Sequence, residues 1–90
     1  MERYAIGAFR SRQQVLRFEA VLRHLNIPCR TVSTPREIAI GCGLSVRVDV
    51  QNAPKMIAAY RTQPSGNLTG FYIVEAEHGK TRVMPIPYMD

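Results

Sequence analysis

A cysteine between two glycines is the residue of this sequence best suited to covalent chemistry. Cys42 stands in the run Gly41-Cys42-Gly43, six residues after Arg36. Glycine on both sides permits backbone conformations in which successive amide groups point at one anion. A nearby guanidinium favours the thiolate over the thiol. These residue types at this spacing predict a sulfur that is reactive and stabilised as an anion.

A thiol that accepts sulfur must attack as the thiolate. The pKa of an unperturbed cysteine is about 8.5, so only a small fraction is ionised near neutral pH. We therefore expect Arg36, Gly41 and Gly43 to lower the pKa of Cys42. A fall of about 1 to 2 in pKa corresponds to about 1.4 to 2.7 kcal/mol, and the same groups would hold an anionic persulfide.

Each of these residues also has a structural interpretation. A lone cysteine near the start of a strand is often a small buried apolar side chain. The two glycines can shape a bulge or turn whatever Cys42 does, and Arg36 can simply pair with its neighbour Glu37. For the glycines, the structural and the chemical interpretation can both hold.

The second cysteine, Cys29, follows Pro28 at the start of a predicted strand, which favours a structural role. It could instead resolve a persulfide or disulfide at Cys42 if the two strand ends lie together. No Cys-x-x-Cys pair occurs, and His24 and His78 have no metal-ligand spacing to either cysteine. We therefore expect no metal and no other cofactor.

Length and charge limit the possibilities further. Ninety residues make a single domain, which we assign to residues 1–90, and a chain of this size buries only ~60–65% of its unfolded surface. The net charge is +5, and ten of the twelve basic residues are arginine. Because the guanidinium fork pairs with carboxylates and phosphates, this excess favours an acidic partner, an oxyanion or a nucleic acid.

The cysteine count and the apolar runs bear on location. A disulfide scaffold of this size usually has four or more cysteines, whereas this chain has two and shows no secretory signal. No stretch approaches the ~20 apolar residues that cross a bilayer. We therefore expect a cytoplasmic protein with no membrane association.

Apolar periodicity places the elements of the first half. Residues 3–9 form an apolar and aromatic run that predicts a strand. Ser11 stands three residues before Gln14, the spacing of a capping box, and predicts the start of a helix that ends at Asn26. The apolar stripe of this helix consists of Val15, Phe18, Val21, Leu22 and Leu25.

The second half contains the clearest strand. Residues 44–50 alternate apolar and polar side chains with period two, and residues 28–33 form an extended run before them. Asn52 and Pro54 predict a second helix that runs to about Gln63. Residues 71–76 predict a fourth strand. Residues 81–86 could return as a fifth, at the sheet edge because Pro85 cannot donate to a ladder.

The resulting order, β-α-β-β-α-β, is the split βαβ pattern of ferredoxin-like α+β domains. It predicts an antiparallel sheet with two helices on one face and, from residues 81–86, a possible extra strand in a C-terminal hairpin. The other face would then be open or would pair with a second copy. Since a small domain gains from burying such a face, we expect a homodimer.

The loop residues resemble a known family. Thr34-Pro35-Arg36-Glu37-Ile38 followed by Gly41-Cys42-Gly43-Leu44 is similar to the signature of the selenium/sulfur carrier protein-like family of small bacterial proteins. The similarity covers roughly residues 1–60 and weakens from Gly66 onward. The residues that match the family pattern position by position are Pro35, Arg36, Glu37, Cys42 and Gly43.

The resemblance implies a carrier that holds sulfur or selenium on Cys42 as a persulfide or selenosulfide. It implies two partners: a cysteine desulfurase or other donor, and an acceptor protein. In this interpretation Thr34, Pro35 and Glu37 shape the loop. Such a protein transfers a group between enzymes and need not turn over a substrate itself.

Two other classes of function remain open at the level of sequence. A basic ferredoxin-like domain can bind RNA or a small anionic ligand without covalent chemistry. RNA-recognition domains of this strand order carry aromatic residues on their middle strands, whereas residues 45–50 have none and include Asp49, which disfavours nucleic acid. A regulatory domain that dimerises through its sheet is the remaining alternative.

Overall fold

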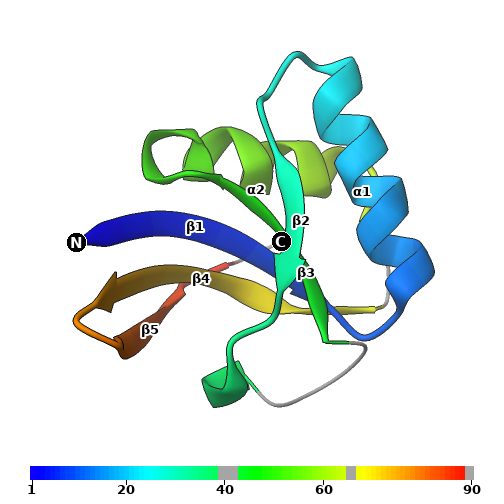
Figure 1. The fold of residues 1–90 in the computed structure, drawn as a ribbon. Coiled ribbons are helices and arrows are strands. Elements are labelled where there is room, and N and C mark those ends of the chain that lie inside the picture. The colour runs from blue at the N-terminus through cyan, green and yellow to red at the C-terminus, as the bar shows by residue number, and fades with distance from the viewer. Residues whose placement is uncertain (39–42, 65–66, 89–90) are drawn as a thin grey trace.

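The computed structural model of the chain describes residues 1–38, 43–64 and 67–88. Its elements are β1 (Glu2–Phe9), α1 (Arg12–His24), β2 (Arg30–Ser33), the 3-10 turn η1 (Arg36–Ile38), β3 (Leu44–Asp49), the 3-10 turn η2 (Val50–Asn52), α2 (Ala53–Thr62), β4 (Leu68–Glu77) and β5 (Lys80–Ile86) (Figure 1). Neither α-helix in these ranges is long and apolar enough to cross a membrane.

The strands form one antiparallel sheet in the order β2-β3-β1-β4-β5. The predicted α+β class, with an antiparallel sheet and two helices, is confirmed. The sheet has five strands where a ferredoxin-like sheet has four, because residues 80–86 pair along β4 as a full edge strand. The β4–β5 turn uses two residues with positive φ, His78 at 50° and Gly79 at 76°.

Both ends of α1 differ in detail from the prediction. Ser11 is the N-cap of α1, but its side chain makes no capping bond, so the predicted capping box is wrong. Instead, the Ser11 carbonyl accepts hydrogen bonds from the amides of Gln14 and Val15. Leu25 follows the last helical residue and is 50% exposed, so it does not belong to the buried stripe.

The main hydrophobic core lies between the two helices and one face of the sheet (Figure 1). Its centre is aromatic: the rings of Phe9, Phe18 and Tyr60 pack with centroids 5.3–6.1 Å apart, and Phe71 lies 5.7 Å from Tyr60. Tilted and edge-to-face pairs of this kind add stability beyond the area that they bury. This core fixes both helices on the same face of the sheet.

The second face of the sheet is not open, which corrects the expectation from sequence. Ile6, Ala8 and Val74 are at most 1% exposed on this face, and Ile38 of η1 packs against them. The 3-10 turn η1, which follows β2 (Figure 1), therefore packs on this face and covers part of it through Ile38. A bare apolar face was the reason for expecting a homodimer, and that reason no longer applies.

Candidate functional site

The predicted reactive cysteine belongs to the connection between β2 and β3. Cys42 and Gly41 lie outside the residues that the structure describes, as do residues 39 and 40. The two ends of this connection are described: Thr34 to Ile38 on the β2 side and Gly43 on the β3 side. Their contacts show how the fold holds the connection on which the predicted chemistry depends.

Two hydrogen bonds join the ends of the connection. The Thr34 amide donates to the Gly43 carbonyl at 2.8 Å. The Thr34 hydroxyl lies 2.7 Å from the Ser45 hydroxyl, and either oxygen can be the donor. Ser45 is fully buried, so this contact satisfies a polar group that has no access to solvent. Through these two contacts Thr34 joins β2 to β3 at the end of the connection.

The 3-10 turn η1 anchors the connection to the second face of the sheet. The Ile38 amide donates to the Pro35 carbonyl at 3.0 Å, which closes the turn. The Ile38 side chain is only 5% exposed in the cluster with Ile6 and Val74. Arg36 and Glu37, between Pro35 and Ile38, are exposed. Within the described ranges no ion pair joins Arg36 to Glu37.

Gly43 has a backbone conformation that favours glycine. Its φ is +80°, in the left-handed region, where a side chain is strained. Among the described residues, no atom lies within 4 Å of a Cβ built at this position, so the backbone conformation is the reason for glycine that the described residues show. This supports the turn-forming interpretation of Gly43 and leaves its solvent side open.

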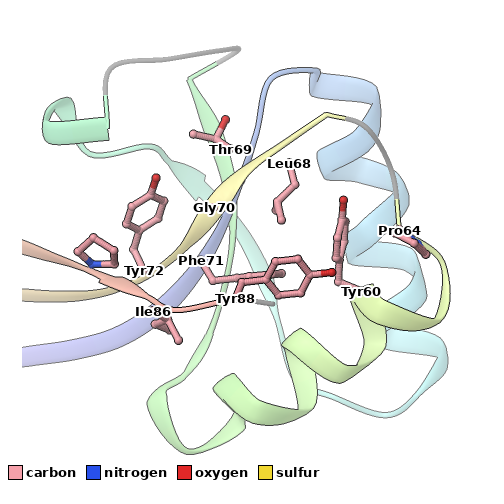
Figure 2. Close-up of a pocket in the computed structure, with 10 residues that line it drawn as sticks. Tyr60, Pro64, Leu68, Thr69, Gly70, Phe71, Tyr72, Ile86 and Tyr88 are labelled. Atoms are coloured by element: carbon pink, nitrogen blue, oxygen red, sulfur yellow. The ribbon is translucent and has the colours of Figure 1, made fainter. Parts of the chain in front are cut away.

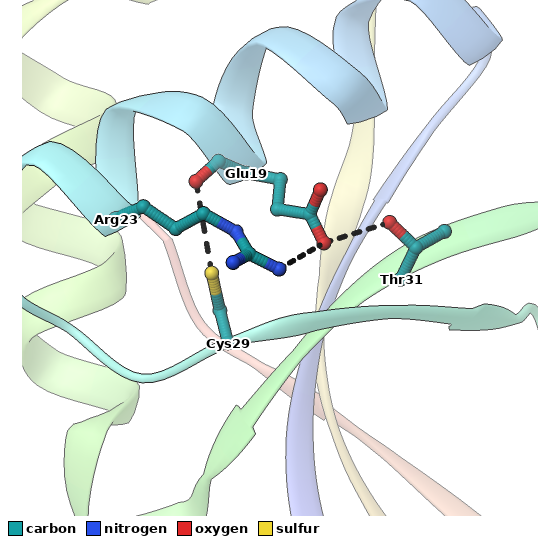
Figure 3. A network of polar contacts seen from close by, with 4 residues as sticks. All are labelled: Glu19, Arg23, Cys29 and Thr31. Atoms are coloured by element: carbon teal, nitrogen blue, oxygen red, sulfur yellow. Dashed lines mark hydrogen bonds and ion pairs between the residues drawn. The ribbon is translucent and has the colours of Figure 1, made fainter.

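The other cysteine, Cys29, lies in a different environment beneath α1 (Figure 3). Its thiol donates a weak hydrogen bond to the Glu19 carbonyl, with Sγ and O 3.6 Å apart. The Glu19 carboxylate accepts hydrogen bonds from the Thr31 hydroxyl at 3.0 Å and from Arg23 at 3.4 Å. Burial raises the pKa of Cys29, Glu19 raises it further, and Arg23 acts in the opposite direction. These surroundings favour the protonated thiol.

Cys29 and Gly43 are at opposite ends of the β2–β3 hairpin. Cys29 precedes Arg30, which pairs with Arg47, whereas Gly43 precedes Leu44, which pairs with Ser33. The strand between Arg30 and Ser33 spans ~10 Å at the usual rise per residue. A disulfide requires Cα atoms within ~7 Å of each other, which is less than the length of this strand.

The comparison with known proteins gives a family. Residues 4–67 match the family model described as "Putative Se/S carrier protein-like". The chain belongs to this family. No curated protein and no solved structure matches it. The suspected family is thus confirmed, and the match spans the whole β2–β3 connection, Cys42 included.

The structure explains several residues of the Se/S carrier-like signature in physical terms. Pro35 and Ile38 close and anchor η1, and Gly43 provides the left-handed turn before β3. Arg36 and Glu37 have no such role, since both are exposed. Among the described residues of the signature, the side chains of Arg36 and Glu37 and the backbone of Gly43 are therefore exposed for contact with a ligand or partner.

Sequence reasoning missed Ser45 and Arg47 in this Se/S carrier-like chain, because the alternation of β3 suggested that both faced solvent. Ser45 is fully buried under the connection. The Arg47 guanidinium stacks 3.8 Å from the centroid of the Tyr4 ring and pairs with Glu2 at 3.1 Å. The apolar run of β1 was the available signal, since a strand with no polar face is covered on both sides. In the ranges described, no cluster of three potential metal ligands occurs.

Proposed function

We propose that this Se/S carrier-like protein carries sulfur or selenium on Cys42 as a persulfide or selenosulfide. The observation that carries the proposal is the family match over residues 4–67, which includes Gly41-Cys42-Gly43. Two features support it. The hydrogen bonds of Thr34 to Gly43 and Ser45 join the ends of the connection that bears the cysteine, and the packing of Ile38 holds its first turn on the sheet. A carrier needs its thiol on a defined but accessible loop.

The transfer step is a thiolate exchange that requires no metal. The Cys42 thiolate attacks the terminal sulfur of a donor persulfide, and a new S–S bond forms as the old one breaks. The electron pair of the broken bond leaves with the donor, which becomes a thiolate. Delivery to an acceptor thiolate repeats the exchange in the opposite direction. With selenium, the transferred atom is selenium and the balance is the same.

We assign supporting roles to the residues around Cys42. Arg36 is exposed on η1 and is the cation proposed to stabilise the thiolate and the persulfide, together with the backbone of Gly41 and Gly43. Pro35 and Glu37 belong to the same turn and shape it. The cysteine is thus proposed to act in a connection that is anchored at Ile38 and has a cation at Arg36.

We propose a structural role for Cys29. Its raised pKa keeps the thiol protonated near neutral pH, and a thiol is a poor nucleophile. It also lies at the end of the hairpin away from Gly43. We therefore propose that Cys29 does not act as a resolving thiol for a persulfide on Cys42.

The proposed partners are a cysteine desulfurase or other donor of sulfur or selenium, and an acceptor protein, in the cytoplasm. The basic surface supports this pairing, because the net charge of +5 attracts an acidic protein surface and speeds encounter. We also propose a homodimer, although the second face of the sheet is not a bare apolar surface.

The test is transfer from a cysteine desulfurase supplied with cysteine, followed by peptide mapping of the added sulfur. The wild-type chain is expected to gain one sulfur atom on the peptide that contains Cys42. Cys42→Ser should abolish the gain, and Cys29→Ser should retain it. Equal loss in both variants, or sulfur mapped to Cys29, would contradict the assignment.

A further inference from the structure

A hollow of about 420 Å³ lies between the loop that follows α1 and one side of α2. Two of the apolar residues that line it, Ile27 and Ala59, are buried, at 7% and 5% exposed. A third, Leu25, is 50% exposed although leucine is strongly apolar. A half-exposed leucine at the border of a hollow offers apolar surface that the side chains of a partner can cover.

The loop wall of this hollow has a fixed backbone. Asn26 has a positive φ of 61°, the left-handed conformation that ends many helices. The Ile27 amide donates to the Leu22 carbonyl at 2.9 Å, and the Asn26 amide donates to the Arg23 carbonyl at 3.0 Å. These two bonds are the pair that defines a Schellman motif. The wall is therefore formed before a partner binds, which lowers the entropy cost of binding.

The α2 wall of the hollow is a row of residues along one side of the helix. Lys55, Ala59 and Thr62 follow one another at spacings of four and three, so they lie on one side of α2 over ~10 Å. Ala58, next to this row, also lines the hollow and is exposed. Small side chains let a second helix approach closely, and its own residues at the same spacing can fit between them. This wall therefore favours a helix as the occupant.

The charges around the hollow favour an acidic occupant. The acidic residue of the two helices is Glu19, and its carboxylate bonds to Thr31 of β2 and to Arg23. Lys55 lines the hollow and makes no ion pair within the described ranges. Arg17 lines a further hollow between the helices, and the described lining of both hollows contains no acidic residue. The exposed cations of the two helices are Arg12, Arg17, Arg23, Lys55 and Arg61.

We propose that the hollow between α1 and α2 binds an acidic amphipathic helix of a partner protein. Apolar side chains of that helix fill the hollow beside Leu25, and its carboxylates pair with Lys55 and Arg17. The helices cover one face of the sheet, and Ile38 of η1 packs on the other. Docking on the helices therefore does not use the face that anchors the β2–β3 connection, and the proposal does not depend on the carrier function.

The probe is the peptide acetyl-Glu-Glu-Leu-Leu-Glu-Ala-Leu-Leu-Glu-Glu-Leu-Ala-Glu-amide, stapled on its polar face because a free helix of this length is marginal. It is titrated into the full-length chain and followed by the backbone NMR signals. Saturable shifts are expected at Leu25, Lys55 and Ala58. Tyr72 and Tyr88 are internal controls, since they line a separate hollow of about 500 Å³ beside β4 (Figure 2). The described lining of that hollow has no charged residue, so general apolar binding would shift these signals instead.

Two pairs of variants test the two contacts. Leu25→Ala should weaken binding about tenfold, because it removes apolar surface that the helix covers. Leu16→Ala is its control and should leave binding unchanged, since Leu16 is 49% exposed on α1 but does not line the hollow. Lys55→Glu should also weaken binding about tenfold. Arg12→Glu changes the net charge equally and should weaken binding by about twofold at most in about 0.15 M salt.

Four results would each overturn the proposal. The first is an equal effect of a variant and its control. The second is equal binding of the same peptide with lysine in place of each glutamate. The third is a set of shifts at Tyr72 and Tyr88 with none at Lys55. The fourth is no saturable shift with the peptide, and a shift of the Lys55 signal by oligothymidylate would then assign the surface to nucleic acid.

Discussion

Cys29 illustrates how the surroundings of a thiol can keep it out of sulfur exchange. Its side chain is half-buried under α1, its Sγ donates to the Glu19 carbonyl, and the nearest carboxylate belongs to Glu19. Each of these factors disfavours the anion. If Cys42 carries sulfur as proposed, the chain benefits because its other thiol is unreactive.

The raised pKa of Cys29 predicts a pH dependence of stability. Well below the ordinary cysteine pKa of about 8.5, the thiol is protonated in both the folded and the unfolded chain, so its contribution to stability is constant. As the pH rises further, the unfolded chain loses its proton first, and the free energy of unfolding falls. We expect urea unfolding to show this fall in the wild type and a smaller fall in Cys29→Ser. Identical profiles from pH 8 to 10.5 would contradict the assigned pKa direction.

The hydroxyl pair of Thr34 and Ser45 gives a second prediction for single residues. Thr34→Val removes the partner of a fully buried hydroxyl, so we expect a loss of about 1–3 kcal/mol in the free energy of unfolding. Thr34→Val with Ser45→Ala should recover part of the loss, because no buried hydroxyl is then left unpaired. Denaturant titration of these two variants and of Ser45→Ala alone measures both effects. Additive losses would contradict a direct bond.

Among the elements, η1 decides how firmly the β2–β3 connection is held. We expect Ile38→Val to lower the free energy of unfolding by about 0.5–1.5 kcal/mol, because it removes a buried methylene. The Ile38 amide should then exchange faster with solvent, since it closes the turn on Pro35. Glu37→Ala is the matched control on the exposed side of the turn. A cost for Glu37→Ala as large as that for Ile38→Val would contradict the anchoring role.

The elements that the sequence predicted best are those with a strong local signal. The alternation of β3 placed that strand within one residue of its observed end, and Asn52 with Pro54 located the start of α2. The start of β4 was placed three residues too late. Thr69 and Gly70 are poor signals for a strand, and only the pairing of Leu68 with Phe9 in β1 extends it. Such long-range pairing cannot be deduced from a local pattern.

At the scale of the whole molecule, the segment that matches the family is not a complete fold. Residues 4–67 end before β4, yet β4 pairs with β1 from Leu68 to Ala76 and supplies Phe71 and Val74 to the two hydrophobic clusters. The connection with Cys42 packs on the sheet that β4 completes. The sheet that anchors the β2–β3 connection at Ile38 therefore includes residues outside the match to the family model.

A fragment ending at Asn67 is accordingly expected not to fold. It lacks the central pairing of β1 with β4, so we expect no cooperative thermal transition by circular dichroism. A second fragment ending at Glu77 keeps both clusters except for the partly buried side chains of Val83, Ile86 and Tyr88, and should fold with a lower Tm. A cooperative transition in the shorter fragment would contradict this account of the domain.

The candidate site was predictable in part. The family signature and Gly41-Cys42-Gly43 are visible in the sequence, and so is the need for glycine before β3. The burial of Ser45 was not, because its partner Thr34 is eleven residues away and the alternation of β3 assigned it to solvent. The packing of Ile38 on the second face was not predictable either, since a three-residue turn has no periodicity that identifies its neighbours.

The central claim is that Cys42 carries sulfur or selenium, and intact-mass spectrometry of protein purified without reductant tests it most directly. A fraction of the wild-type chain should be heavier by one sulfur or selenium atom. The addition should disappear after treatment with a thiol reductant and should be absent from Cys42→Ala but present in Cys29→Ala. A single unmodified mass for the wild type, also after incubation with a persulfide donor, would contradict the claim.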